Sequence, residues 1–268
     1  MDYMTFFGFE KQPFRSSLKS EELLITDQLQ NWKARFDFVT SHRLWAVLTG
    51  DVGAGKSTAI RWALETLPHP EYKPVLVTGC GGSVLETYRR ILIALGQPAP
   101  GFRARMWQVI TQSFTEIAKD KVTPILIIDE ASLIPLEVFK ELHTLTQFEY
   151  DSKPIVSMIL AGQEDLVDKL SYPSSRPLAS RITARMHLTA GDLNQTRAYV
   201  EHHLKIGGVR KTLLEESAVV ALHQASGGIL RNINNLMRCA LITATSEKRQ
   251  NIMAEDIRIA STELFLNP

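Results

Sequence analysis

The chain has 268 residues, enough for one large domain or for one domain with a smaller one attached. Hydrophobic residues make up 44% and charged residues 22% of it, values typical of a soluble globular protein that exclude a disordered or low-complexity chain. The formal net charge of +1 excludes a uniformly basic surface, although a local basic stripe is compatible with it. Cys80 and Cys239 are too few for a disulfide framework, and no apolar run has the length of a membrane span.

Residues 1–20 form an aromatic lead-in. Its aromatic side chains are Tyr3, Phe6, Phe7, Phe9 and Phe14. Rings at this density must pack on something, and two partners are open: the core of the protein or the adenine of a bound nucleotide. Residues 21–43 follow with apolar side chains at helical spacing and predict a helix.

A strand, a glycine-rich loop and a helix come next. Residues 44–49 are a short apolar run typical of a buried parallel strand, and residues 58–65 have helical periodicity. Between them lies the sequence Gly50-Asp51-Val52-Gly53-Ala54-Gly55-Lys56-Ser57-Thr58, which matches the phosphate-binding pattern G-x-x-x-x-G-K-[ST]. The glycines let the loop turn its N–H groups toward a β-phosphate at the positive end of the helix dipole. We expect the loop to bind ATP, with Lys56 reaching the β- and γ-phosphates and Ser57 ligating Mg²⁺.

A phosphate-binding loop requires a carboxylate for the metal further along the chain. Between the phosphate-binding loop and the candidate carboxylate, the pattern predicts a strand at 73–78 and helices at 84–95 and 105–119, with Ser83 as a helix N-cap. The aliphatic run Ile125–Ile128 then predicts a strand buried on both faces, and it ends in Asp129 and Glu130. We expect Asp129 to hold Mg²⁺ directly or through water, and Glu130 to polarise the attacking water. This predicts hydrolysis of ATP to ADP and phosphate, in a cytoplasmic enzyme given the cysteine content.

The remaining pattern divides into two parts. Up to residue 190 it predicts a helix at 135–146, a strand at 155–161, a short helix at 164–170, a helix end at 180–186 and a short strand at 187–188. After that it predicts only helices, at 193–206, 213–225, 230–245 and 254–265. The fold class is therefore α/β, a parallel sheet covered by helices on both faces in residues 1–190, followed by a small all-helical lid domain in residues 191–268. This combination suggests a P-loop AAA+ module.

An AAA+ module gives roles to further polar residues. Gln163, after the strand at 155–161, either orients the lytic water as sensor 1 or is a simple turn residue. Among the arginines before the last strand, Arg181 is our first candidate and Arg185 our second for a finger that a neighbouring subunit supplies, the alternative being ordinary surface arginines. Arg231, at the start of a lid helix, is the candidate sensor 2.

Several segments together carry a resemblance to a known family. They are Phe6–Phe9 with Pro13 and Phe14, Leu48–Ser57, Ile127–Ala131, Leu160–Gln163, Ser180–Arg185, and Gly227 with Arg231–Ile233. In order and spacing they resemble the ExeA/GspA-type AAA+ ATPases over almost the whole chain. Secretion-pathway members of that type add a membrane span and a cell-wall-binding region after the ATPase. This chain ends at Pro268 without them, so it resembles more closely the stand-alone ATPases that serve transposases, of the TnsC, TniB, IstB and MuB kind.

The stand-alone resemblance implies particular partners. It implies ATP-bound rings or helical filaments of this chain on duplex DNA that recruit or activate a transposase, with hydrolysis slow and used for disassembly. By the same resemblance the DNA would meet the loop ending at Ser83 and the turn that carries Arg103 and Arg105, although both can be ordinary solvated loops. Without a base-reading motif, such binding is expected to be independent of sequence and sensitive to salt. The alternative function is a cytoplasmic ATPase of a secretion or cell-envelope assembly system acting on protein partners; a helicase-loader role is a third.

Overall fold

A computed structural model describes residues 2–148 and 154–264. The chain divides into two compact units. The α/β unit contains Thr26–Val52 and Lys56–Leu188, and the helical unit contains Met1–Ile25, Gly53–Gly55 and Thr189–Pro268. Among the described residues, no helix is long and apolar enough to cross a membrane.

The α/β unit is built on one five-stranded sheet. Its strands are β1 (Trp45–Gly50), β2 (Tyr72–Thr78), β3 (Thr123–Asp129), β4 (Ser157–Gly162) and β5 (Ile182–Leu188). They lie in the order β2-β3-β4-β1-β5, and every neighbouring pair is parallel. All carboxyl ends therefore meet at one edge of the sheet, where ligands of open α/β folds bind.

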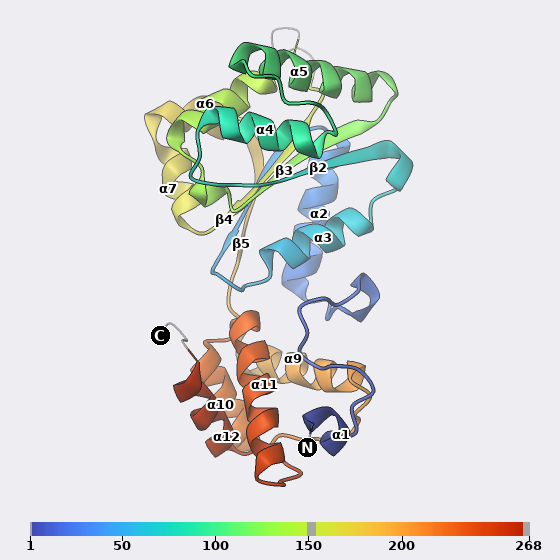
Figure 1. Ribbon diagram of the computed structural model, residues 1–268, viewed down its shortest axis with the longest axis vertical. Coiled ribbons are helices and arrows are strands. Elements are labelled where there is room, and N and C mark those ends of the chain that lie inside the picture. Colours follow the sequence, from blue (N-terminus) through green and yellow to red (C-terminus); the bar gives the residue numbers. More distant parts are fainter. Residues whose placement is uncertain (1, 149–153, 265–268) are drawn as a thin grey trace. The chain divides into compact units, whose positions relative to one another are not determined.

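Helices cover both faces of this sheet (Figure 1). They are α2 (Asp27–Ser41), α3 (Lys56–Glu65), α4 (Val84–Ala94), α5 (Arg103–Lys119), α6 (Leu136–Leu145), α7 (Asp165–Ser171) and α8 (Arg176–Ala179), with 3-10 turns η2 (His69–Glu71), η3 (Ala131–Leu133) and η5 (Pro173–Ser175). Leu126 and Ile128 of β3 join one core with Tyr88 and Phe114, while Ile125 and Ile127 are buried on the other face. Because alternate side chains leave opposite faces of a strand, an all-aliphatic strand needs cover on both. The predicted fold class is confirmed.

Two predicted elements of this unit differ from the structure. The helix predicted at 21–43 begins only at Asp27, where the side chain of Thr26 caps it by accepting from the N–H of Leu29 at 3.3 Å. The prediction of a helix end at 180–186 is wrong, because Ile182–Leu188 is a strand paired with β1. Its side chains alternate between half-buried and exposed along the strand, the two-residue period of a sheet edge.

The helical unit contains the C-terminal helices and the lead-in. Its elements are α1 (Tyr3–Phe7), η1 (Ser20–Glu22), α9 (Leu193–Ile206), α10 (Glu216–Ser226), α11 (Leu230–Ser246) and α12 (Ala254–Glu263). The last helix was expected to reach Phe265, which lies outside the described residues.

The lead-in packs within the helical unit, whereas the predicted boundary assigned it to the α/β domain. Phe7, Phe9 and Phe14 are buried in the core of the helical unit. The Phe14 ring stacks on His203 at 5.2 Å, and its backbone N–H donates to Nδ1 of His203 at 3.1 Å. Arg238 of α11 donates to the carbonyl oxygen of Phe14. Of the two partners considered for these rings, the protein core is the one observed for the three buried phenylalanines.

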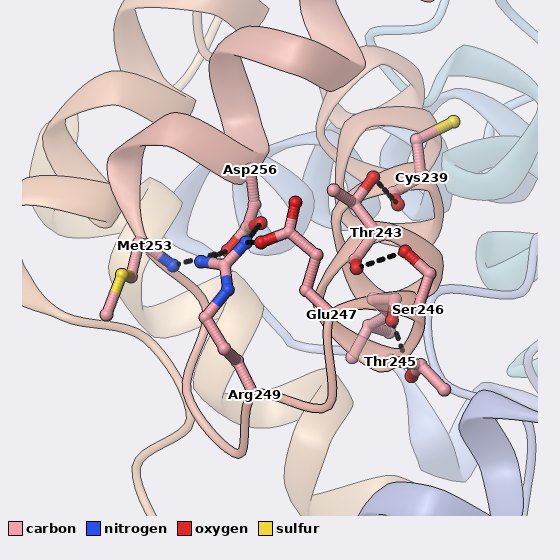
Figure 2. A network of polar contacts seen from close by, with 9 residues as sticks. Cys239, Thr243, Thr245, Ser246, Glu247, Arg249, Met253 and Asp256 are labelled. Carbon is pink, nitrogen blue, oxygen red and sulfur yellow. Dashed lines mark hydrogen bonds and ion pairs between the residues drawn. The ribbon is translucent and has the colours of Figure 1, made fainter.

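A buried ion pair fixes the loop between α11 and α12 (Figure 2). Asp256 is fully buried and accepts from Arg249 with both carboxylate oxygens, at 3.0 and 2.5 Å. It also accepts from the backbone N–H of Met253 at 2.8 Å, and Glu247 accepts from the same guanidinium at 2.6 Å. A buried carboxylate is tolerated when it is paired and hydrogen-bonded in this way.

Candidate active site

The phosphate-binding loop connects β1 to α3. Gly53 and Gly55 have φ of +88° and +99°, in the left-handed region that favours glycine. Lys56 is 6% exposed, and its Nζ donates to the carbonyl oxygens of Gly50 at 2.8 Å and Asp51 at 2.9 Å. The lysine ammonium is thus held against the loop that the sequence predicts to wrap a phosphate chain.

The carboxylate at the end of β3 is hydrogen-bonded to the residue that follows the lysine. The Oγ of Ser57 donates to Oδ2 of Asp129 at 2.6 Å, and Oδ1 of Asp129 accepts from the backbone N–H of Glu130 at 2.9 Å. Hydroxyl and carboxylate oxygens are the hard ligands that Mg²⁺ prefers, and these two are close enough to bind the same ion. The described residues contain no cluster of three His, Cys, Asp or Glu side chains suited to a metal. The two oxygens fit a Mg²⁺ ion that takes its other ligands from phosphate and water.

Glu130 follows this carboxylate in an unusual backbone conformation. Its φ of 54° and ψ of 37° are left-handed, which costs a non-glycine residue about 1 kcal/mol or more. The carbonyl oxygen of Glu130 accepts from the N–H of Leu133 at 3.0 Å, within the tight turn that leads into η3. Strain of this kind is concentrated at functional sites.

Gln163 lies at the same edge of the sheet, directly after β4. In the strand order β4 lies between β3 and β1, and Gly162 pairs with Thr49 just before the phosphate-binding loop. The backbone N–H of Gln163 donates to Oγ of Ser132 at 3.4 Å. The register thus places Gln163 between the two motifs, as the sensor 1 prediction requires.

Comparisons with known proteins agree with this geometry. A family model described as "AAA domain" matches residues 39–170. Cdc6p from Pyrobaculum aerophilum has a TM-score of 0.76 at 17% identity, covering 95% of this chain and 71% of that one. The chain is an ATPase with the AAA+ fold.

Other proteins similar to this AAA+ ATPase are named for different processes. General secretion pathway protein A from Aeromonas hydrophila is 30% identical over 271 residues, which cover 98% of this chain and 48% of that protein. The ATPase thus spans about half the length of that relative. The ORC1 protein of Aeropyrum pernix, solved in complex with DNA, has a TM-score of 0.69 at 16% identity, covering 92% of this chain and 68% of that one.

The candidate finger arginine of the ATPase lies far from its own phosphate-binding loop. Arg181 directly precedes β5, where its guanidinium lies 5.0 Å from the centre of the Trp45 ring and donates to Oγ1 of Thr146 at 3.3 Å. Trp45 is the first residue of β1 and Gly50 the last, so the two ends are separated by roughly 16 Å of strand. Arg185 is exposed in the middle of β5, opposite Val47.

Arg231 of the ATPase is exposed at the start of α11. Gly53–Gly55 group with the helical unit, and within it the N–H of Arg231 donates to the carbonyl oxygen of Gly53 at 3.3 Å. A Cβ on Gly53 would lie 2.6 Å from Cβ of Arg231, so glycine is needed there. The backbone at Arg231 therefore contacts Gly53.

The three residues predicted to face DNA have different surroundings in the ATPase. Ser83 is exposed and caps α4, accepting from the N–H of Glu86. Arg103 forms an ion pair with Glu141, which also accepts from the hydroxyl of Tyr88 at 2.6 Å. Burial raises the pKa of Tyr88, so its hydroxyl remains a donor. Arg105 is exposed and donates to Gln108. The charge of Arg103 is therefore partly neutralised within the chain, whereas no carboxylate among the described residues pairs with Arg105.

Sequence reasoning missed groups that surround the turn after Glu130. Lys169 of α7 donates to the carbonyl oxygens of Ser132 and Ile134, the latter at 3.1 Å. Gly79, after β2, donates its N–H to the carbonyl oxygen of Asp129 at 2.6 Å. The only sequence signal for Gly79 is a glycine at the end of a predicted strand, and Lys169 has none.

Proposed function

We propose that the chain is an ATP- and Mg²⁺-dependent ATPase of the ExeA/GspA type, which assembles with copies of itself and acts on protein partners in a secretion or cell-envelope assembly system. The observation that carries the proposal is the 30% identity to a general secretion pathway protein A across 98% of the chain. This reverses the order of the two functions predicted from the sequence. The transposition regulator becomes the second candidate, since none of the relatives described above is named for transposition.

In this proposal some residues bind the nucleotide and the metal, and others act on the attacking water. Lys56 would bind the β- and γ-phosphates, and Ser57 with Asp129 would hold Mg²⁺, which supplies positive charge to the phosphate oxygens. The Glu130 carboxylate would accept a proton from the attacking water as its oxygen bonds to the γ-phosphorus. The bond from the γ-phosphorus to the bridging oxygen breaks, leaving ADP and phosphate. Gln163 would orient the water.

The finger role would require a second copy of the chain. Within one chain, Arg181 lies at the amino end of the sheet and the phosphate-binding loop at the carboxyl end. An arginine side chain extends about 7 Å, which is less than half of the roughly 16 Å between the two ends of β1. Only a neighbouring subunit could therefore place Arg181 on a γ-phosphate. Arg231 would report the nucleotide to the helical unit.

The second candidate is an ATP-dependent DNA-binding regulator that assembles on duplex DNA and recruits a transposase. The observation that favours it is the exposure of both Phe102 and Arg105, three residues apart at the start of α5. Exposed cations and exposed aromatic rings are the side chains that contact phosphates and stack on bases in nucleic-acid-binding proteins. The ion pair of Arg103 with Glu141 counts against this candidate, because it reduces the positive charge of the same surface.

Electron microscopy of the purified protein with a non-hydrolysable ATP analogue, with and without duplex DNA, distinguishes the two functions. We expect oligomers that need the nucleotide and form equally well without DNA. The variant Lys56→Ala is the control, and it should not assemble under either condition. Oligomers that form only when DNA and nucleotide are both present would overturn the proposal and establish the second candidate.

A further inference from the structure

The end of β2 lies in close contact with the backbone of the turn that begins at Glu130 and leads into η3. Thr78 pairs with Asp129 in the β2–β3 ladder, and Gly79 continues that pairing by donating its N–H to the carbonyl oxygen of Asp129 at 2.6 Å. A Cβ built on Gly79 would lie 2.4 Å from the carbonyl oxygen and 2.9 Å from the carbonyl carbon of Glu130. These are backbone atoms, so no side chain can rotate away to make room.

The atoms that such a Cβ would displace belong to the strained residue. Glu130 is left-handed at φ 54°, and its carbonyl oxygen also accepts from the N–H of Leu133. The direction of the Glu130 side chain depends on this backbone conformation. A left-handed glutamate persists only where its surroundings hold it, and Gly79 contacts it from the side of β2.

The opposite side of the turn is held by other groups. Lys169 donates to the carbonyl oxygens of Ser132 and Ile134, and Ser132 Oγ accepts from the N–H of Gln163. The turn thus has little freedom to move away from an added methyl group at position 79. A shift there would change the backbone angles of Glu130 itself.

We propose that Gly79 is a positioning residue for ATP hydrolysis: because it has no side chain, the end of β2 closes on the Glu130 backbone and fixes where the carboxylate meets the attacking water. The proposal rests on the role of Glu130 proposed above. In this proposal Gly79 has no contact with the nucleotide. A substitution there should therefore impair the chemical step and leave nucleotide binding unchanged.

The test compares Gly79→Ala with Gly81→Ala in steady-state ATPase assays without DNA, alongside binding of a fluorescent ATP analogue. Gly81 lies in the same loop, and a Cβ there would meet nothing within 4 Å. We expect Gly79→Ala to lower kcat about 10- to 100-fold, the usual effect of a misplaced catalytic group, with KM and analogue binding unchanged. Gly81→Ala should keep the kcat of the wild type. A kcat for Gly79→Ala equal to that of Gly81→Ala would overturn the proposal, as would equal losses in kcat and binding.

Glu130→Gln separates this proposal from the role of Glu130. If Glu130→Gln hydrolyses ATP at the wild-type rate, the role of Glu130 is wrong; if only Glu130→Gln loses turnover, the role stands and the positioning by Gly79 fails. Hydrogen exchange of the wild-type protein gives a second test that needs no variant. The Gly79 amide should exchange as slowly as that of Val77 in β2, and fast exchange at Gly79 alone would contradict the proposed contact.

Discussion

The residues of the phosphate-binding loop and of the β3 end are joined by one short hydrogen bond. Ser57 donates to Asp129 at 2.6 Å, which ties the start of α3 to the tip of β3. Lys56 uses two carbonyl groups of its own loop to hold its ammonium in place. Both arrangements hold polar groups in fixed positions, which lowers the cost of ordering them during the reaction.

At this scale the binding and chemical roles can be separated by two substitutions. Lys56→Ala removes the cation for the β- and γ-phosphates, so we expect loss of nucleotide binding. Glu130→Gln keeps the shape of the side chain but cannot accept the proton, so binding should persist while kcat falls about 10²- to 10⁴-fold. A fluorescent ATP analogue measures the first effect and phosphate release the second. Equal hydrolysis by Glu130→Gln and wild type would assign the base to another group.

Among the elements, β5 and the lead-in show how a local pattern can mislead. The segment Ile182–Leu188 has apolar residues two apart, yet its arginine, methionine and alanine are also good helix formers. Pairing with β1 outweighs that preference. Without β5, the apolar strand β1 would be an edge strand with unpaired backbone N–H and C=O groups. Phe14 likewise gives no local signal for its partner, His203, which lies 189 positions further along the chain.

The contact between the lead-in and α9 makes stability depend on pH. His203 is 1% exposed, and burial, followed by the nearby His202, Arg238 and Arg15, lowers its pKa to about 4. In the unfolded chain the same ring takes up its proton below about pH 6.5. Between these values only the unfolded state binds the proton, so this stability is full above pH 6.5 and is lost as the pH falls toward 4. The loss is of the order of 3 kcal/mol.

Urea unfolding followed by circular dichroism between pH 4 and 7 measures this dependence. In His203→Gln the slope attributable to His203 should disappear, since an amide does not titrate, while the amide oxygen can still accept from Phe14. The matched control is His42→Gln, at the exposed residue directly after α2, which should keep the slope of the wild type. An unchanged slope in His203→Gln would show that protonation of His203 does not cause the pH dependence of stability.

At the scale of the whole molecule, one chain does not bring every predicted site residue to one place. The α/β unit brings together Lys56, Ser57, Asp129, Glu130 and Gln163 at the carboxyl edge of its sheet. Arg181 lies at the opposite edge, over Trp45. A complete site would therefore be a property of an assembly, and hydrolysis would depend on protein concentration.

Mixing two inactive variants tests whether Arg181 acts between subunits. Arg181→Ala retains an intact nucleotide site and Glu130→Gln retains the arginine, so each alone should be inactive while a mixture recovers activity. We expect Arg181→Ala to lower kcat by about 10³-fold or more, as for other arginines supplied in trans. Arg185→Ala is the control and should retain most activity. If the mixture stays inactive, the guanidinium serves only its own chain through Trp45 and Thr146.

The sequence by itself determined the loop from Gly50 to Thr58, the aliphatic β3 ending in Asp129 and Glu130, and the change from strands to helices near residue 190. These features depend on neighbouring residues, because backbone sterics and side-chain periodicity act over a few positions. Only the tertiary structure decided that Gly79 contacts Glu130 and that Gln163 lies between the ends of β1 and β3. It also decided that the lead-in packs in the helical unit and that Arg181 lies at Trp45, far from its own phosphate-binding loop. These depend on strand order and packing between distant segments, which no local pattern encodes.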